Sequence, residues 1–128
     1  SLIQMIIPSS TTIITEKTFY QCSSLAQVSI PSSVISIQKH AFMKCSSLLQ
    51  VAIPPSVIEI GESAFEDCAA LVQVSFPSTI KLIGKMAFKG CTGLKQVLIP
   101  SSIESVANDS FPAETNVIKV DKEGCHIC

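Results

Sequence analysis

The sequence lacks several features that define common functional classes. It has no tryptophan, one tyrosine and a formal net charge of −1 over 128 residues. A chain this close to neutral has no electrostatic surface for nucleic acid and no basic face for anionic lipid. No apolar run approaches the roughly 18 residues of a membrane-spanning helix. We therefore expect no nucleic-acid partner and no membrane-spanning segment.

Groups that carry chemistry are also scarce. The two histidines, His40 and His126, are far apart in the chain, and the five glycines are scattered and form no phosphate-binding loop. An enzyme needs titratable groups that converge in a pocket. The sequence suggests neither a carboxylate pair nor a Cys/His/Asn constellation. We therefore expect a protein that is not an enzyme and has no catalytic residues, no metal and no cofactor.

What the sequence has instead is a repeat of 23 residues. Five kinds of residue recur at this step over most of the chain, and such a period is the signature of a repeat architecture. The recurring positions are Leu2, Leu25, Leu48, Leu71 and Leu94; Gln4, Gln27, Gln50, Gln73 and Gln96; Pro8, Pro31, Pro54, Pro77 and Pro100; Phe19, Phe42, Phe65, Phe88 and Phe111; and Cys22, Cys45, Cys68 and Cys91.

One unit, LAQVSIPSSVISIQKHAFMKCSS at residues 25–47, shows the expected elements. Its first part alternates apolar and polar residues, which predicts a short half-buried strand that ends at Pro31. Val34 and Ile37 predict a second short extended piece. The apolar residues of 41–48 recur at steps of one, three and three, which suits a short helical or 3₁₀ turn with its apolar side inward.

A single unit cannot bury its apolar residues, whereas stacked units bury them against their neighbours. We expect the strands of successive units to form one parallel sheet at a spacing of about 4.8 Å, with Gly61 and Gly84 where the chain must turn. The repeated cysteines are predicted to be free core thiols, because stacked side chains point parallel and four collinear ligands suit no tetrahedral zinc site. The predicted structural core includes Cys22, Cys45, Cys68, Cys91, Phe42, Phe65 and Phe88.

The motif L-x-x-V-x-I-P-x-S-V-x-x-I-G-x-x-A-F-x-x-C resembles the 23-residue leucine-rich repeat of BspA-like proteins, and the resemblance runs from Leu2 to about Phe111. It implies a curved right-handed solenoid and non-catalytic roles at cell surfaces, such as adhesion to host or matrix proteins. We therefore expect an α/β leucine-rich repeat solenoid with a parallel β-sheet on one face and short 3₁₀ or helical turns opposite. We expect it to span residues 1–120 as about five repeats, followed by a C-terminal tail at residues 121–128.

The two ends depart from the pattern in different ways. Glu114 stands where the next cysteine would be, while Val117 and Val120 fit the leucine and valine columns. We therefore expect a last strand at residues 116–120. The N-terminal edge carries apolar core columns and no polar cap, which predicts a truncated solenoid or one that self-associates through this edge.

A solenoid binds ligands with its outward columns. We predict that a nearly uncharged concave sheet binds a protein ligand, with its exposed apolar residues as the better candidates. The glutamines have an alternative role, because stacked amides can hydrogen-bond along the sheet and stabilise it. The candidate binding residues are Leu49, Val72, Leu98, Gln27, Gln50, Gln73 and Gln96.

A second outward column alternates in charge from one repeat to the next. Alternating signs are expected of solvated salt-bridge ladders, in which each exposed pair contributes about 0–1 kcal/mol. Lys81 likewise precedes Glu104 by one repeat. We expect these charges to set register and solubility rather than to bind a ligand. The column consists of Glu16, Lys39, Glu62 and Lys85.

The chain closes on CHIC, outside the repeat. Cys125 is the fourth residue from the end and Ile127 is aliphatic, which matches the C-a-a-X prenylation signal, although His126 and Cys128 depart from its usual residues. A lipid on Cys125 would place the protein in contact with a membrane. The alternatives are a redox pair, half of a zinc site with His126 as a further ligand, and two incidental thiols.

The triplet Asn108-Asp109-Ser110 is a rival signal, because it is an N-glycosylation acceptor and glycosylation requires the secretory lumen. We predict a non-catalytic protein-binding scaffold tethered at the plasma membrane through Cys125. The alternative is a secreted or cell-surface adhesin that binds host or matrix proteins, with an incidental tail. The expected location is the plasma membrane or cell surface, or the cytoplasm if the tail is unmodified and no secretion signal lies upstream.

Overall fold

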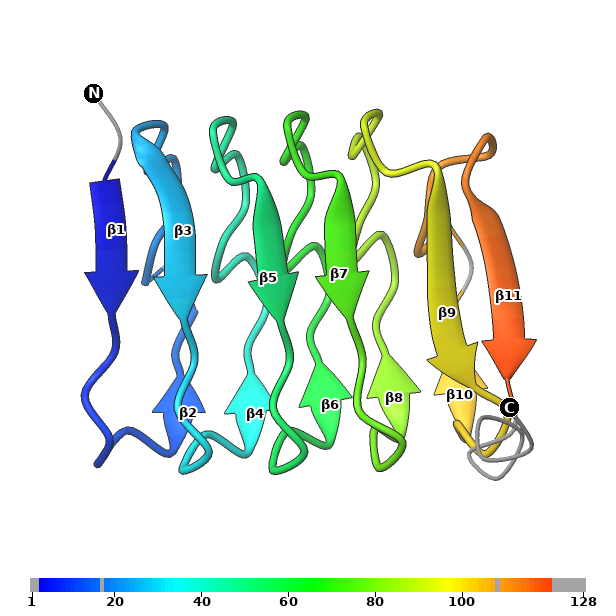
Figure 1. Cartoon of the computed structure of the whole chain (residues 1–128), viewed down its shortest axis with the longest axis horizontal. Coiled ribbons are helices and arrows are strands. Elements are labelled where there is room, and N and C mark those ends of the chain that lie inside the picture. The colour runs from blue at the N-terminus through cyan, green and yellow to red at the C-terminus, as the bar shows by residue number, and fades with distance from the viewer. Residues whose placement is uncertain (1–2, 17, 108, 121–128) are drawn as a thin grey trace, which may run out of the picture.

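The computed structural model describes residues 3–16, 18–107 and 109–120. Within these ranges the chain winds into a parallel β-solenoid of about five turns. Six strands lie side by side on what we call the front face (Figure 1): β1 (Ile3–Ile6), β3 (Leu25–Ser29), β5 (Gln50–Ala52), β7 (Gln73–Ser75), β9 (Gln96–Pro100) and β11 (Asn116–Val120). Five two-residue strands form what we call the back face: β2 (Ile13–Ile14), β4 (Ser36–Ile37), β6 (Glu59–Ile60), β8 (Leu82–Ile83) and β10 (Ser105–Val106).

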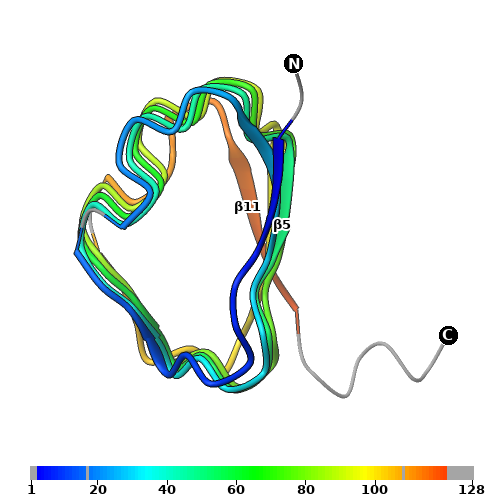
Figure 2. The ribbon, with the colours of Figure 1, turned by 90° about the vertical axis from the view of Figure 1, so that its left-hand side faces the viewer.

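Successive turns stack in register, as the repeat predicts. Viewed along the stack, most of them superimpose around one ring (Figure 2). On the front face Gln50 pairs with Gln27 and Gln73, and on the back face Ile37 pairs with Ile60. All these pairings are parallel, so each repeat places its equivalent side chains beside those of its neighbours.

The front face is not one continuous sheet, contrary to expectation. Strands β1, β3, β5 and β7 form a four-stranded sheet, and β9 and β11 form a separate two-stranded one. The break follows Phe76, which stands at the end of β7 where other repeats carry isoleucine. Its ring packs edge-on against Phe88, with centroids 5.7 Å apart and planes at 85°. The larger ring accompanies the loss of pairing between β7 and β9.

The last strand exists where the sequence predicts it, but its register is different. Val117 of β11 pairs with Val97, 20 residues earlier rather than 23. Val117 and Val120 therefore do not take the leucine and valine columns, and that prediction is wrong. Both are exposed, because no further strand of the described chain pairs with β11. The register changes because the corner before β11 is shorter. In this corner the Thr115 N–H donates to the Pro112 carbonyl at 3.0 Å, and the chain enters β11 early.

The core contains the predicted columns. Phe42, Phe65 and Phe88 are fully buried and stack face to face, with ring centroids 4.9 and 5.0 Å apart. The thiols of Cys45, Cys68 and Cys91 are equally buried and free, whereas Cys22 is only half-buried, which corrects its assignment to the buried core. In the described part of the chain no turn stacks on the N-terminal side of Cys22, so its side chain remains partly open.

Within the described residues the structure has no helix, so the expected 3₁₀ or helical turns are not confirmed. The corners do contain i+3 to i hydrogen bonds, such as Cys45 N–H to the Phe42 carbonyl at 3.2 Å. Other corner N–H groups donate to the next repeat instead, such as Phe42 to the Ala64 carbonyl at 2.7 Å. Positive φ angles at His40 (61°) and Lys44 (65°) also interrupt a helical backbone.

Gly61 is required for a reason other than the expected turn. Its φ is not in the left-handed region, but a Cβ atom built on it would lie 2.6 Å from the Lys39 nitrogen and 2.7 Å from the Gln38 carbonyl carbon. The absence of a side chain therefore permits a close approach between neighbouring repeats and leaves the surface hollow there.

Candidate binding surfaces

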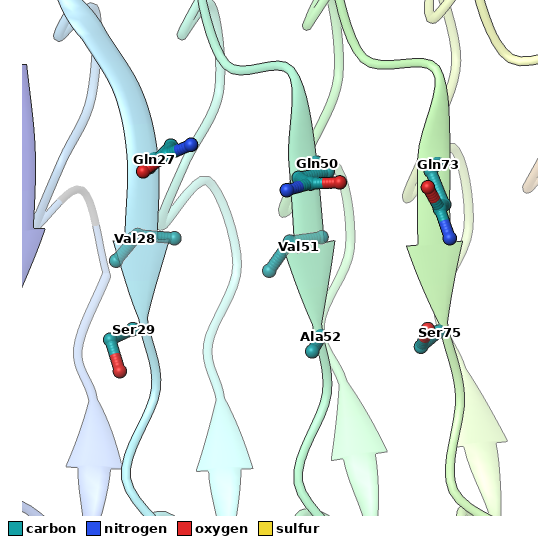
Figure 3. Close-up of a pocket in the computed structure, with 8 residues that line it drawn as sticks. All are labelled: Gln27, Val28, Ser29, Gln50, Val51, Ala52, Gln73 and Ser75. Carbon is teal, nitrogen blue, oxygen red and sulfur yellow. The ribbon is translucent and has the colours of Figure 1, made fainter.

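The front face carries a shallow hollow of about 310 Å³ over β3, β5 and β7. Figure 3 shows the glutamine side chains on adjacent strands at its upper edge and the small residues below them. Because the strands are paired in register, equivalent side chains from three repeats contribute to one surface. The residues that line this surface are Gln27, Gln50, Gln73, Val28, Val51, Ser29, Ala52 and Ser75.

The three glutamine amides are available to a ligand. In the part of the chain that the structure describes, no protein group forms a hydrogen bond with the side chains of Gln27, Gln50 or Gln73. The stabilising amide ladder considered from the sequence is therefore not formed in this structure. Each amide retains two donors and one acceptor oxygen directed to the exposed side of the sheet.

Apolar side chains flank this hollow on one side. Leu49 is 43% exposed and Val72 is 57% exposed, and each directly precedes a glutamine of the column. Ala26, at the equivalent position of the preceding repeat, is buried. The apolar strip therefore begins at β5.

The structure separates the remaining predicted binding residues from this hollow. Gln96 and Leu98 are exposed, but both belong to β9, beyond the break in the front sheet. Of the predicted binding residues, Gln27, Gln50 and Gln73 line the hollow, with Leu49 and Val72 beside it.

The front face is nearly uncharged, and charges collect elsewhere. The predicted pair between Lys81 and Glu104 closes at 3.4 Å. The charge column at Glu16 and Lys39 and its continuation behaves differently: within the described residues these groups form no ion pair with one another inside 4.0 Å. Glu16 instead lies 4.0 Å from Nδ1 of His40. Of the predicted opposite-sign pairs named above, only Lys81 and Glu104 are therefore within ion-pair distance.

The four cysteines in the described part of the chain are poor candidates for a reactive site, because Cys45, Cys68 and Cys91 are fully buried. Burial and, less strongly, the nearby Cys45 thiol raise the pKa of the half-buried Cys22 thiol. The Cys45 thiol, the Cys91 thiol and burial together raise the pKa of Cys68, whereas the Cys68 thiol lowers the pKa of Cys45. Thiols that remain protonated are poor nucleophiles. Across the described ranges no group of three or more His, Cys, Asp or Glu side chains is placed to hold a metal ion.

Two sequence signals lie outside the described residues. These are Asn108 of the glycosylation triplet and the CHIC terminus that contains Cys125. The structure therefore tests neither signal. Among the residues that it does describe, no helix has the length and apolar character needed to cross a bilayer.

Sequence reasoning missed a groove of about 450 Å³ on the back face. Its signal was present in the sequence, since the small residues Gly61 and Gly84 follow the back strands and the charge column follows the glycines. A smaller hollow of about 220 Å³ lies at the first turn, lined by Ile6, Ile14 and Phe19 among others. The residues that line the back groove include Glu16, Ser36, Lys39, Glu59, Gly61 and Leu82.

Comparisons with known proteins agree with this architecture. A family model described as the BspA type leucine rich repeat region matches residues 1–118 with six copies. A leucine-rich repeat protein from Bacteroides ovatus superimposes with a TM-score of 0.84 at 37% identity, over 91% of this chain and 30% of that one. One from Eubacterium ventriosum gives 0.83 at 26% identity, over 92% and 32%. This chain thus spans about a third of these two solved proteins.

A more distant structural relative shows the fold alone. It is a leucine rich cell surface protein from Faecalibacterium prausnitzii, with a TM-score of 0.50 at 21% identity, over 85% of this chain and 50% of that one. No curated protein matches the chain.

Proposed function

The chain belongs to the BspA type leucine-rich repeat family, and from this premise we propose that it is a non-catalytic scaffold whose front face binds another protein. Leucine-rich repeats commonly mediate protein binding, and solenoids of this family are generally non-catalytic. Extended solenoid surfaces suit such recognition because equivalent side chains from several repeats act together.

One observation carries the proposal: three glutamine amides, which have no hydrogen-bond partner among the described residues, line an uncharged hollow beside exposed apolar side chains. The amides can satisfy both donors and acceptors of a ligand's polar groups. Leu49 and Val72 supply apolar surface that a partner can bury. This combination fits a weakly polar protein surface better than a highly charged ligand.

The experiment is quantitative capture of partners with variants of the front face. Gln50→Lys places a charge in the centre of the hollow, and Val72→Lys places one on its apolar strip. A partner retained by the unmodified protein should be lost by both variants. Lys44→Glu is the matched control, because Lys44 is exposed on a corner away from this face. Equal capture by all proteins would contradict the assignment of the front face.

We extend the proposal to the membrane through the C-terminal signal at Cys125. A prenyl chain there would hold the scaffold at the plasma membrane, although one lipid alone binds only marginally. Mass spectrometry of the C-terminal peptide from native cells tests this step. A prenyl adduct on Cys125 supports the tether, and an intact CHIC terminus removes it without affecting the front face.

The alternative location is the cell surface, with the protein acting as an adhesin for host or matrix proteins. The same fold occurs in a protein described as a cell surface protein, so the solenoid is compatible with that setting. A glycan on Asn108 would favour this alternative, because glycosylation and prenylation take place in different compartments. Protease shaving of intact cells measures the location directly.

A further inference from the structure

The back face exposes several large apolar side chains to solvent. Ile35 and Ile58 are 47% and 40% exposed, and they are neighbours in the stack, with the Ile58 N–H donating to the Ile35 carbonyl at 2.9 Å. Ile13 and Leu82 are 43% and 40% exposed on β2 and β8. Apolar residues that gather on one face in this way mark a contact surface.

The charges on this face alternate along the stack, so the column is complementary in charge to a reversed copy of itself. Glu16 and Lys39 border the same groove as the β4, β6 and β8 side chains, and Glu62 and Lys85 continue the column at the next two repeats. Read from the first repeat to the fourth, the signs are negative, positive, negative, positive. Read in reverse, every sign is opposite. Among the described residues these four groups form no ion pair with one another, and only Glu16 has another ion-pair partner, His40 at 4.0 Å, so the column can pair across an interface.

A two-fold axis parallel to the strands, between the second and third repeats, would place opposite charges of two copies against each other. It lays a second copy on the back face with its stack reversed, so that each column meets itself. Glu16 then faces Lys85 of the second copy, and Lys39 faces Glu62 of the second copy. Both pairs occur twice, as in any isologous interface.

The same axis also brings the apolar residues together. Ile35 of one copy faces Ile58 of the other, and Ile13 faces Leu82. The charged pairs and the apolar pairs are produced by the same two-fold axis. The pairing buries side chains that are otherwise 40–47% exposed.

Shape is complementary under this operation too. The column after the back strands reads Thr15, Gln38, Gly61, Gly84. Reversal sets the long side chain of Gln38 against Gly61 of the second copy and the smaller Thr15 against Gly84. The groove of about 450 Å³ over the glycines thus receives side chains from the partner's first two repeats.

We propose that the back face binds a second copy of this chain, forming an antiparallel two-fold dimer. The shared face covers four repeats, about 19 Å along the stack at about 4.8 Å per repeat. This lies at the low end of specific interfaces, so the dimer is weak and concentration-dependent. The front faces then point away from each other, and the dimer presents two separate ligand-binding surfaces.

Sedimentation velocity over a concentration series tests the proposal with charge swaps at the centre of the face. Lys39→Glu alone sets two pairs of carboxylates against each other, and Glu62→Lys alone sets two pairs of ammonium groups together. Each variant should weaken self-association by about tenfold or more. The double variant Lys39→Glu/Glu62→Lys restores every opposite-sign pair and should dimerise again.

Mixing the two single variants is the sharpest arm, because their opposing charges are complementary. An equimolar mixture should form a heterodimer although neither variant dimerises alone. Lys44→Glu is the control and should dimerise as the unmodified chain does; circular dichroism confirms that each variant is folded. A chain that is monomeric throughout overturns the proposal. So does a dimer that survives Lys39→Glu but is lost in Ile6→Ser, since association would then use the first turn.

Discussion

At the residue scale, the cysteine column has a structural role that its regular spacing did not reveal. The thiol of Cys68 donates to the Phe42 carbonyl at 3.2 Å, and that carbonyl also accepts the N–H of Cys45 at 3.2 Å. Cys45 and Cys91 make equivalent bonds at 3.1 Å. Cysteine therefore fills a small apolar space and satisfies a corner carbonyl of the preceding repeat.

The raised pKa of Cys68 predicts a dependence of stability on pH. A thiol whose pKa is higher in the folded state contributes stability below its unfolded pKa of about 8.5 and loses it as the pH rises. Relative to Cys68→Ala, the free energy of unfolding should therefore decrease above pH 8.5, by up to about 1.36 kcal/mol per pH unit. Denaturant titrations of both proteins measure this difference. Parallel pH profiles would contradict the protonated, buried thiol.

The phenylalanine stack predicts a gradient of side-chain contributions. Phe65→Ala removes a fully buried ring with stacked neighbours on both sides and should cost about 3–5 kcal/mol. Phe19→Ala removes a half-buried ring from the end of the stack and should cost less. Chemical denaturation of both variants checks the order. Equal losses would show that the stack does not act through neighbouring contacts.

At the scale of the element, the repeat predicted both strands of each unit, because period and composition are local properties. It could not distinguish a 3₁₀ turn from the corner that forms. Both place apolar residues such as Phe42 and Cys45 three apart and share an i+3 to i hydrogen bond. What differs is the N–H of Phe42, which donates to the next repeat, and this partner is visible only once the turns are stacked.

The exposure of β11 at the end of the described stack predicts that its valines contribute less to stability than the core residues with which they align. Aligned at 23 residues, Val117 takes the place of Leu94, yet Leu94 is buried and Val117 is 38% exposed. Leu94→Ala should cost about 2–5 kcal/mol. Val117→Ala should change stability by only about 0.5 kcal/mol. Thermal or denaturant unfolding of both variants measures this difference, and a large loss for Val117→Ala would contradict its exposed position.

At the scale of the whole molecule, the sequence predicted part of the candidate site. The alternation of polar and apolar residues around Gln50 predicted which side chains of the strand face outward, and these side chains are exposed in the structure. The repeat did not predict the break in the front sheet after Phe76. Gln96 was therefore grouped with glutamines that lie on another sheet. The sequence also did not predict that the back face is complementary to itself. This becomes apparent only when a second copy is placed on the face with its stack reversed, so that Glu16 meets Lys85.

The two faces of the solenoid thus differ in chemistry. The front face offers uncharged amides and apolar side chains, whereas the back face offers alternating charges beside isoleucines. Such a division lets one repeat unit serve two contacts without overlap. It also means that charge substitutions at Lys39 should leave ligand binding at Gln50 unchanged in a monomeric assay.

The most direct measurement is site-specific photo-crosslinking in cells that express the protein, with a photoreactive amino acid in place of Gln50, Ile58 or Lys44. The probe at Gln50 should capture a different protein, and the probe at Ile58 should capture a second copy of this chain. The corner probe at Lys44 should capture neither. Adducts of equal yield at all three positions, or none at Gln50 beyond the level at Lys44, would contradict the assignment of separate binding faces.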